Sequence, residues 1–244
     1  MDLSIIIPAY NEEALIERSV QETLRFFSSQ PLLWELIVVN DGSTDATGKI
    51  LEVLRQRDAR VRVITFPKNR GKGAAVREGF QQSAGDYLLF FDADLSTPLA
   101  EFPAFWSQRD AHTVLIASRV SSGAAILRHQ RYIKEWAGRA SNVLVRAATS
   151  LPFRDTQCGF KLFPRSFRTL LPHTAIDRAA FDIEWLLCAR RNGLTIQELP
   201  VRWTNRPESR FGMASYLRTL GELAAIFRRD RRGAYRIRSR SSYA

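Results

Sequence analysis

Cysteine, histidine and long apolar stretches are scarce in this sequence of 244 residues. The two cysteines, Cys158 and Cys188, form no metal-binding or CxxC spacing, so two reduced thiols are the expected state, with one disulfide as the alternative. The three histidines are scattered, which argues against a Ser-His-Asp or Cys-His catalytic centre. No run approaches the roughly 18 apolar residues of a transmembrane helix, and Asp2 before the short apolar run 3–8 is atypical of a signal peptide.

Two common nucleotide-binding loops are also missing. The segment 69–79 reads NRGKGAAVREG, which lacks the spacing and the Ser or Thr of a P-loop, and Val76 stands where a GxGxxG loop needs its third glycine. The first expected strand is followed by Ala9-Tyr10-Asn11-Glu12 rather than by a glycine-rich turn. A P-loop ATPase and an NAD-dependent enzyme are therefore disfavoured.

Positive charge is concentrated in the second half of the chain. Residues 1–122 hold 13 Lys and Arg against 16 Asp and Glu, whereas residues 123–244 hold 23 against 9. The formal net charge of the whole chain is +11. Such an asymmetry favours a polyanionic partner, either an anionic membrane surface or nucleic acid, over solubility as its only purpose.

The first half alternates short apolar runs with helical patterns. Strands are expected at 3–8, 34–40, 61–66, 86–91 and 113–118, and helices at 12–27, 44–57 and 71–84. Strands that alternate with single helices predict right-handed βαβ units and a mostly parallel sheet. Residues 1–120 therefore have the pattern of an α/β nucleotide-binding layer.

The second half is less regular. Its expected elements are a long amphipathic helix at 126–148, a loop entering a short strand at 154–164, a helix at 179–193, a strand at 194–203 and a helix at 214–227. Pro200 marks an edge or an irregularity in the last of these strands. From residue 228 onward the chain is rich in arginine and is expected to be disordered.

Four polar segments follow apolar strands of the first half. They are 8–12, 40–43, 67–71 and 92–94. Because ligands of open α/β sheets bind outside the carboxyl ends of the strands, these segments are expected to line one ligand crevice.

Two of these segments have a functional and a structural interpretation. Asp92 and Asp94 can hold Mg²⁺ or Mn²⁺ between protein and phosphate oxygens, although an Asp-capped turn has the same pattern. Asp41 in NDGSTD can accept hydrogen bonds from a base or a ribose, although Asp-Gly is also an ordinary turn before a helix.

Six segments of the sequence, taken together, resemble the motifs of a known family. SIIIPAYNEE, IVVNDGSTDAT, NRGKGAAVREG, LLFFDADLSTP, ASR and DTQCGFKLF are similar, in this order, to the motifs of the family 2 inverting glycosyltransferases. The resemblance covers about residues 3–212. Within the family, RDTQCGFKLF followed by FDIEWL looks most like the dolichyl-phosphate β-glucosyltransferases, which use UDP-glucose. The mannosyl relatives, which use GDP-mannose, share most of the other motifs.

The resemblance implies an α/β fold of GT-A type, with a mostly parallel central sheet flanked by helices and a helical, membrane-facing C-terminal part. Residues 1–227 would form one catalytic domain, and 228–244 a basic tail. Within that domain, 1–122 would bind the nucleotide-sugar, and 123–227, including the amphipathic helix 126–148, would bind the acceptor.

The resemblance also implies roles for particular residues. The nucleotide-binding positions would be Pro8, Tyr10, Glu12, Asp41, Asn69, Lys72 and Asp92. A Mg²⁺ or Mn²⁺ ion would be held by Asp92 and Asp94, with Asp94 as the first choice for direct ligation. The catalytic positions would be Asp94, Arg119, Asp155 and Gln157. Phosphate or acceptor contacts would come from Arg119, Arg128, Arg131, Lys134, Arg206, Ser209 and Arg210. Asn40 departs from the family, which commonly has a second acid there.

The implied reaction transfers glucose with inversion to a polyprenyl phosphate of the dolichyl type. Such an acceptor is already anionic, so a general base is of minor importance, and Asp155 or Glu184 would assist if one is needed. The expected location is cytoplasmic, peripheral on the inner face of a membrane and without a transmembrane helix. Mannosyl transfer from GDP-mannose and transfer to a soluble acceptor remain as alternatives. Nucleic-acid binding is not expected, because aromatic residues are not interleaved with the basic ones.

Overall fold

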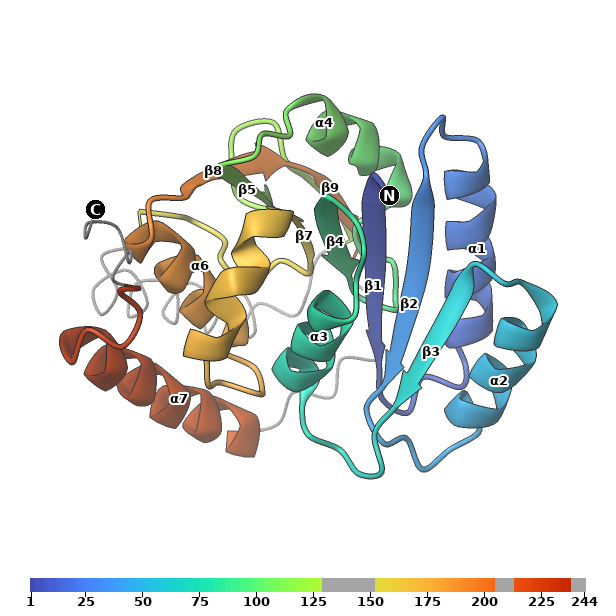
Figure 1. Ribbon diagram of the computed structural model, residues 1–244, viewed down its shortest axis with the longest axis horizontal. Coiled ribbons are helices and arrows are strands. Elements are labelled where there is room, and N and C mark those ends of the chain that lie inside the picture. Colours follow the sequence, from blue (N-terminus) through green and yellow to red (C-terminus); the bar gives the residue numbers. More distant parts are fainter. Residues whose placement is uncertain (129–151, 205–212, 238–244) are drawn as a thin grey trace, which may run out of the picture.

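The computed structural model describes residues 1–128, 152–204 and 213–237. Its centre is a seven-stranded sheet in the order β3-β2-β1-β4-β7-β5-β8, with helices on both faces (Figure 1). The strands are β1 (Leu3–Ala9), β2 (Trp34–Asn40), β3 (Val61–Thr65), β4 (Tyr87–Phe91), β5 (Thr113–Ser118), β7 (Phe160–Pro164) and β8 (Thr195–Pro200). Neighbours pair in parallel except β7, which is antiparallel to both β4 and β5. The parallel strands therefore end at one edge of the sheet, and β7 begins there.

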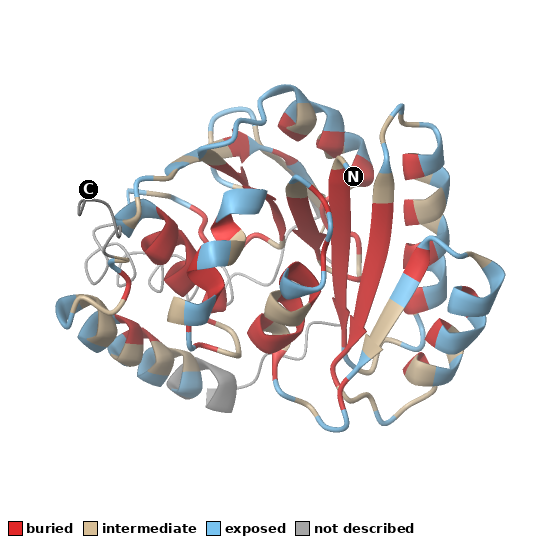
Figure 2. Ribbon diagram, in the orientation of Figure 1, coloured by how far each residue is buried: buried red, intermediate tan, exposed pale blue. Residues whose placement is uncertain are grey.

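Each face of the sheet has its own apolar core. Ile5 and Ile7 of β1 face the helices α1 (Ile16–Ser28), α2 (Thr47–Arg57) and α4 (Phe102–Ser107). The short 3₁₀ helix η1 (Leu99–Glu101) comes directly before α4. Ile6 faces the opposite core, which contains side chains of α3 (Lys72–Gln81), η2 (Arg165–His173), α6 (Phe181–Arg191) and α7 (Met213–Arg231). Because both faces are covered, the central strands are buried along their length (Figure 2), as their continuous apolar sequences require.

The alternation predicted for the first half is confirmed. All five strands and the three helices occur within a few residues of the expected bounds. The sequence did not predict α4 or η2, nor that β7 inserts between β4 and β5. That insertion brings the loop before β7 to the same edge as the ends of β4 and β5.

Three predictions for the second half are wrong. The segment expected to start a helix at 126 instead forms β6 (Ala125–Arg128), because β9 (Arg202–Thr204) offers it a parallel partner in a separate two-stranded sheet. The rest of that predicted helix lies outside the described residues. The single strand expected at 194–203 is divided at Val201 into β8 and β9, directly after Pro200. Finally, residues 228–237 are not a disordered tail, because α7 continues to Arg231 and the buried Tyr235 anchors the turn after it.

Within the described part of the chain, no helix combines the length and the apolarity needed to cross a membrane.

Candidate active site

Asp41 lies directly after β2 and is buried at the edge where the parallel strands end. Its Oδ1 accepts a hydrogen bond from the Arg70 N–H (2.7 Å), and its Oδ2 accepts from the Gly71 N–H (2.8 Å) and from Asn69 Nδ2 (2.9 Å). Burial raises the pKa of Asp41, although these N–H donors act in the opposite direction. Asp41 therefore fixes the loop before α3 against β2, and it brings two predicted nucleotide-binding residues, Asp41 and Asn69, together.

The loop after β1 is joined to the loop after β2. The N–H groups of Asn11 and Glu12 donate to Ser43 Oγ (3.0 Å) and Thr47 Oγ1 (2.8 Å). Asn11 has a φ of 55°, a left-handed conformation that asparagine tolerates better than most residues. The Tyr10 side chain, by contrast, is 42% exposed at this edge. Hydrogen bonds from the backbone thus fix the loop that carries the predicted nucleotide-binding residues Tyr10 and Glu12. The Tyr10 ring itself remains accessible to a ligand.

Asn40, where the family commonly has a second acid, is buried at the end of β2. Its Oδ1 accepts a hydrogen bond from the Ser43 N–H at 3.0 Å. An amide oxygen performs this role as a carboxylate would. Asparagine in place of an acid at residue 40 therefore preserves the turn. Pro8, another predicted nucleotide-binding residue, is buried in the adjacent strand β1.

Asp92 and Asp94 follow β4, and both line a small cavity together with Gly159 and Trp203. Lys72 Nζ, from the first turn of α3, lies 2.5 Å from Asp92 Oδ1. Burial by itself would lower the pKa of Lys72, but the surrounding carboxylates raise it above its usual value. Lys72 is therefore a charged partner of the acid pair.

The turn that carries the acid pair is well braced. Asp94 accepts hydrogen bonds from the N–H and the Oγ of Ser96, at 2.8 and 2.7 Å. Leu95, between them, has a φ of 52°, which is unusual for a residue without a short polar side chain. Gly159 approaches so closely that a Cβ atom there would lie 2.0 Å from Asp92 Oδ2. The position of Asp92 thus depends on glycine at residue 159.

The donor atoms of this pair suit a hard divalent cation. Carboxylate oxygens are preferred by Mg²⁺ and Mn²⁺. In the regions that the structure describes, no group of three or more His, Cys, Asp or Glu side chains could hold a metal. A site with two carboxylates fits an ion that takes its remaining ligands from phosphate and water. The two carboxylates therefore fit the predicted ion. Within the protein, Lys72 is their positively charged partner.

A buried ion pair beneath the acid pair was not predicted. Lys161 of β7 is fully buried, and its Nζ donates to Asp182 Oδ1 (2.7 Å) and to the Cys158 carbonyl (2.6 Å). Burial raises the pKa of Asp182, although Lys161 and Lys72 oppose that effect. The available signals were the lysine within the apolar FKLF and the aspartate within FDIEWL. Neither identifies its partner without the packing of α6 on β7.

Arg119 and Asp155 form a second ion pair at this edge. Arg119 Nε and Nη2 donate to the two oxygens of Asp155, both at 2.7 Å, and the Arg119 N–H adds a third bond at 2.9 Å. Burial would raise the pKa of Asp155, but Arg119 holds it below its usual range. The Trp203 ring lies 5.3 Å from the guanidinium carbon. Asp155 therefore orients Arg119, and Gln157 lies on the same loop.

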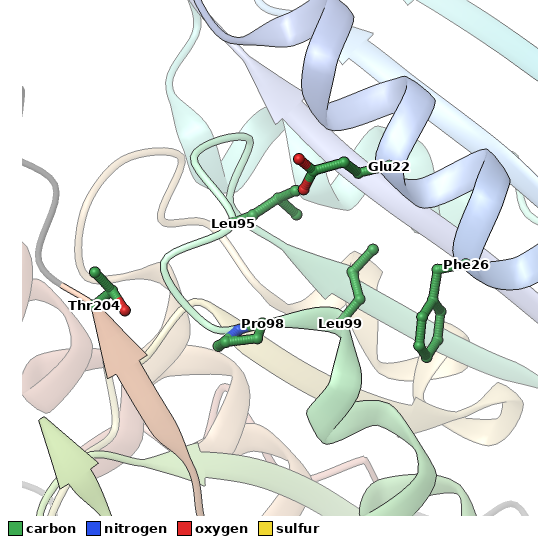
Figure 3. Close-up of a pocket in the computed structure, with 6 residues that line it drawn as sticks. All are labelled: Glu22, Phe26, Leu95, Pro98, Leu99 and Thr204. Atoms are coloured by element: carbon green, nitrogen blue, oxygen red, sulfur yellow. The ribbon is translucent and has the colours of Figure 1, made fainter. Parts of the chain in front are cut away.

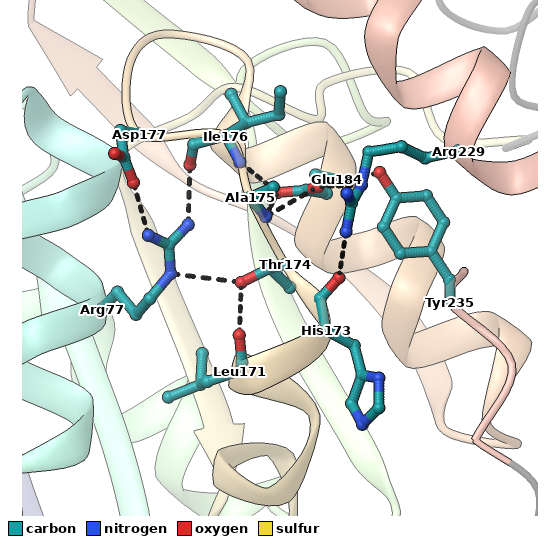
Figure 4. Close-up of polar contacts among 10 residues, drawn as sticks. All are labelled: Arg77, Leu171, His173, Thr174, Ala175, Ile176, Asp177, Glu184, Arg229 and Tyr235. Carbon is teal, nitrogen blue, oxygen red and sulfur yellow. Dashed lines mark hydrogen bonds and ion pairs between the residues drawn. The ribbon is translucent and has the colours of Figure 1, made fainter.

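Glu184, the alternative candidate for a base, is fully buried in α6 and has protein partners for both oxygens (Figure 4). It accepts hydrogen bonds from the N–H groups of Ala175 (2.9 Å) and Ile176 (2.8 Å) and from the Tyr235 hydroxyl (2.8 Å). Arg229 Nε lies 3.6 Å away. Glu184 is thus a structural anchor, and its possible use as a base stays a prediction.

The segment anchored by Glu184 reaches the loop 67–71 before α3. Arg77 of α3 pairs with Asp177 and donates to the Ile176 carbonyl at 2.9 Å (Figure 4). One residue later, Arg178 Nη1 donates to Asn69 Oδ1 at 3.2 Å. Hydrogen bonds and ion pairs therefore connect the C-terminal turn, α6 and the loop before α3.

A cavity of about 340 Å³ lies beside the acid-pair turn (Figure 3). Its lining side chains come from α1, from the 95–99 segment and from β9, and they are Glu22, Phe26, Leu95, Pro98, Leu99 and Thr204. The Thr204 N–H donates to the Ser96 carbonyl at 2.9 Å, which ties β9 to this turn.

Several predicted phosphate-binding residues are not placed by the structure. Arg131, Lys134, Arg206, Ser209 and Arg210 lie outside the described residues. Arg128 ends β6, so the expected helical position is wrong for it.

Comparison with known proteins gives consistent results. A dolichyl-phosphate β-glucosyltransferase of Drosophila melanogaster is 34% identical, over 98% of this chain and 78% of that protein. One from Trichomonas vaginalis is 31% identical, over 98% and 74%. The glucosyl-3-phosphoglycerate synthase of Mycobacterium tuberculosis in complex with UDP has a TM-score of 0.66 and 21% identity, over 98% and 82%. The same synthase has been crystallised with Mn²⁺, UDP and glucosyl-3-phosphoglycerate, with a TM-score of 0.60 and 23% identity over 93% and 76%.

The structural likeness identifies the fold as GT-A, the architecture expected from the sequence. The model of the family "Glycosyl transferase family 2" matches residues 4–171, which is more than half of the chain. The match covers the Asp41 loop, the acid pair, and the Arg119–Asp155 pair. This chain therefore belongs to glycosyl transferase family 2 and is a glycosyltransferase.

Proposed function

We propose that this enzyme transfers glucose from UDP-glucose, with inversion, to a polyprenyl phosphate of the dolichyl type. The names of the Drosophila and Trichomonas relatives support this acceptor and sugar, and each aligns with nearly the whole chain. Mannosyl transfer from GDP-mannose and transfer to a soluble acceptor are the alternatives that the sequence left open.

The observation that carries the proposal is that both candidate bases are occupied. Asp155 is bound through both oxygens by Arg119, and Glu184 is buried among donors of the protein. A hydroxyl acceptor would need a base to remove its proton, whereas a phosphate monoester is already anionic at neutral pH. The geometry therefore favours a phosphate acceptor over a soluble alcohol.

The donor side has a corresponding set of groups. Asp41 and Asn69, with exposed Tyr10, would contact the nucleoside. Asp94 and Asp92 would hold the Mg²⁺ or Mn²⁺ ion. When bound, such an ion stabilises the negative charge that develops on the leaving diphosphate. Lys72 would contribute a positive charge close to the same phosphates.

The acceptor side would use Arg119 together with cations of the second half. Arg119, oriented by Asp155, would contact phosphate directly. The remaining predicted contacts are Arg128, Arg131, Lys134, Arg206, Ser209 and Arg210. Positively charged groups that place two phosphates side by side lower the barrier by orientation as well as by charge. We further propose a peripheral location on the anionic inner face of a membrane, with no nucleic-acid partner.

A transfer assay tests the proposal. The purified chain, with Mg²⁺ or Mn²⁺, is incubated with radiolabelled UDP-glucose or GDP-mannose and with polyprenyl phosphate, and the lipid-linked product is separated by chromatography. We expect a β-linked glucosyl product. A product from GDP-mannose alone would replace the sugar assignment, and transfer only to a soluble alcohol would replace the acceptor assignment.

The acid pair is tested in the same assay with a matched control. Asp94→Ala is expected to abolish transfer and to remove Mn²⁺ binding measured by calorimetry in the presence of UDP. Asp86→Ala removes an exposed acid from the opposite end of β4, where it pairs only loosely with Arg165 (3.4 Å), and should change neither. Full Mn²⁺ binding by Asp94→Ala would contradict the metal assignment.

A further inference from the structure

Helix α7 has apolar side chains on two sides. Leu223 and Ile226, which are 7% and 0% exposed, face the core of the protein. Leu220 and Phe227, which are 49% and 40% exposed, lie on the other side, with exposed Ala224 between them at helical spacing. One apolar side is enough to hold a surface helix on a globular protein. Folding therefore leaves the second apolar stripe without an explanation.

Among residues 218–237, every charged side chain that is exposed is positive. These side chains belong to Arg218, Arg228, Arg231, Arg232 and Arg236. The two acids between residues 218 and 237 point toward the protein. Glu222 Oε2 accepts a hydrogen bond from the Ala180 N–H at 2.9 Å. Asp230 accepts two from Arg191, at 2.8 and 2.6 Å. No acid within the described residues forms an ion pair with Arg228, Arg231 or Arg232.

One contact shows how the two kinds of side chain are combined. The Arg231 guanidinium lies 5.6 Å from the centre of the Phe227 ring. At a bilayer surface, a ring in this position reaches the acyl boundary while the guanidinium beside it remains at the level of the lipid phosphates.

We infer that the outer face of α7 and of the turn after it, formed by Leu220, Ala224, Phe227 and the five arginines, docks on an anionic lipid bilayer. This inference rests on the proposed function, whose lipid acceptor resides in such a bilayer. A bilayer offers phosphates for the arginines and an apolar layer for the stripe. Nucleic acid would match the charge but would leave Leu220 and Phe227 in water.

Vesicle sedimentation of the full chain tests this surface. We expect binding to phosphatidylcholine vesicles that contain about 30% phosphatidylglycerol, little binding to pure phosphatidylcholine, and release at about 0.5 M salt. The R228Q/R231Q/R232Q and L220S/F227S variants should each lower the partition coefficient by roughly tenfold or more. The matched control is R18Q/R25Q/R57Q, which removes the same charge from exposed positions on α1 and α2.

The outcomes separate this inference from its alternatives. An equal loss in the control would attribute binding to net charge and overturn the inference. The surface would be assigned to nucleic acid instead if R228Q/R231Q/R232Q bound vesicles as the wild type does but no longer retarded duplex nucleic acid in a gel-shift assay at physiological salt.

A separate assay with a short, water-soluble prenyl phosphate measures transfer without vesicles, and here the α7 variants should match the wild type. Vesicle binding without transfer from any donor would contradict the proposed function and leave the docking surface supported. Transfer without any vesicle binding would contradict the docking surface and leave the proposed function supported.

Discussion

Replacing Lys161 by methionine should destabilise the fold strongly, because Lys161 is the closest counter-ion of a buried carboxylate. The side chains of Lys161 and Asp182 are 0% and 4% exposed, and their charged atoms lie 2.7 Å apart. Methionine preserves the length and the apolar stem, but it removes the ammonium from Asp182 and from the Cys158 carbonyl. Breaking one side of a buried pair costs about 3–5 kcal/mol, a large part of a typical stability of roughly 5–15 kcal/mol.

The second partner provides the decisive comparison. Because a buried ion pair can be replaced by apolar residues at little cost, the K161M/D182L double variant should be more stable than K161M alone. The free energies of unfolding would be measured by urea denaturation followed by circular dichroism at two pH values. If K161M loses less than about 1 kcal/mol, or if the two substitutions simply add, the pair does not have the energetic role assigned to it.

The pH dependence of K161M follows from the same pair. Burial raises the pKa of Asp182 and Lys161 opposes this, so removing Lys161 should raise that pKa further. The folded state then holds the proton more tightly than the unfolded chain does. Stability must fall as the pH rises from the unfolded value, about 3.9, through the raised folded value. The destabilisation of K161M should therefore be larger at pH 8 than at pH 5.5.

Three other substitutions have specific expected effects. Gly159→Ala places a Cβ atom 2.0 Å from Asp92 Oδ2, so turnover should fall by about 100-fold while circular dichroism remains native. Tyr235→Phe removes the hydroxyl that donates to buried Glu184 and should lower the free energy of unfolding by about 1.5–3 kcal/mol in urea denaturation. Arg119→Lys keeps the charge but loses the two-pronged contact with its carboxylate, so kcat should fall at least tenfold by displacement of the phosphate-binding group.

The controls for these variants come from the same chain. Gly221→Ala adds a Cβ atom with nothing within 4 Å on an exposed helical position, so it should leave turnover unchanged and add up to about 1 kcal/mol of stability. Normal turnover of Gly159→Ala would contradict the placement of Asp92. Wild-type stability of Tyr235→Phe would contradict the anchoring of Glu184. For Arg119→Lys, retention of the wild-type kcat would contradict the proposed contact between Arg119 and phosphate.

Local patterns were sufficient to predict the strands of the first half and the edge at which their polar loops meet. The alternation of apolar runs and helices determines a parallel sheet, and strand ends in such a sheet share one edge. On that basis the sequence alone predicts that Asp41, Asp92 and Asp94 lie at one edge. Their roles toward a ligand stay predictions.

The second half could not be predicted to the same extent, because its elements depend on distant partners. Residues 126–128 were expected to begin a helix, but the segment 125–128 pairs with β9, more than 70 positions later in the chain. The arginine-rich C-terminal segment resembles a disordered tail until Tyr235 is matched with Glu184, 51 residues earlier. Local periodicity carries no information about such contacts, so tertiary pairing overrides it.

The positive charge of the second half consists of two populations that a residue count cannot separate. Lys161 and Arg229 point inward, and each lies against a carboxylate that is at most 4% exposed and comes from the same half of the chain. Arg228 and Arg231 point outward and have no acidic partner among the described residues. The inward charges are shielded from salt by burial, so their removal should cost stability at any ionic strength. The outward charges are screened by salt, so their removal should affect docking at low ionic strength and leave stability unchanged. The ionic-strength dependence of each substitution therefore reveals whether the chain uses that charge to hold its own fold or to hold a partner.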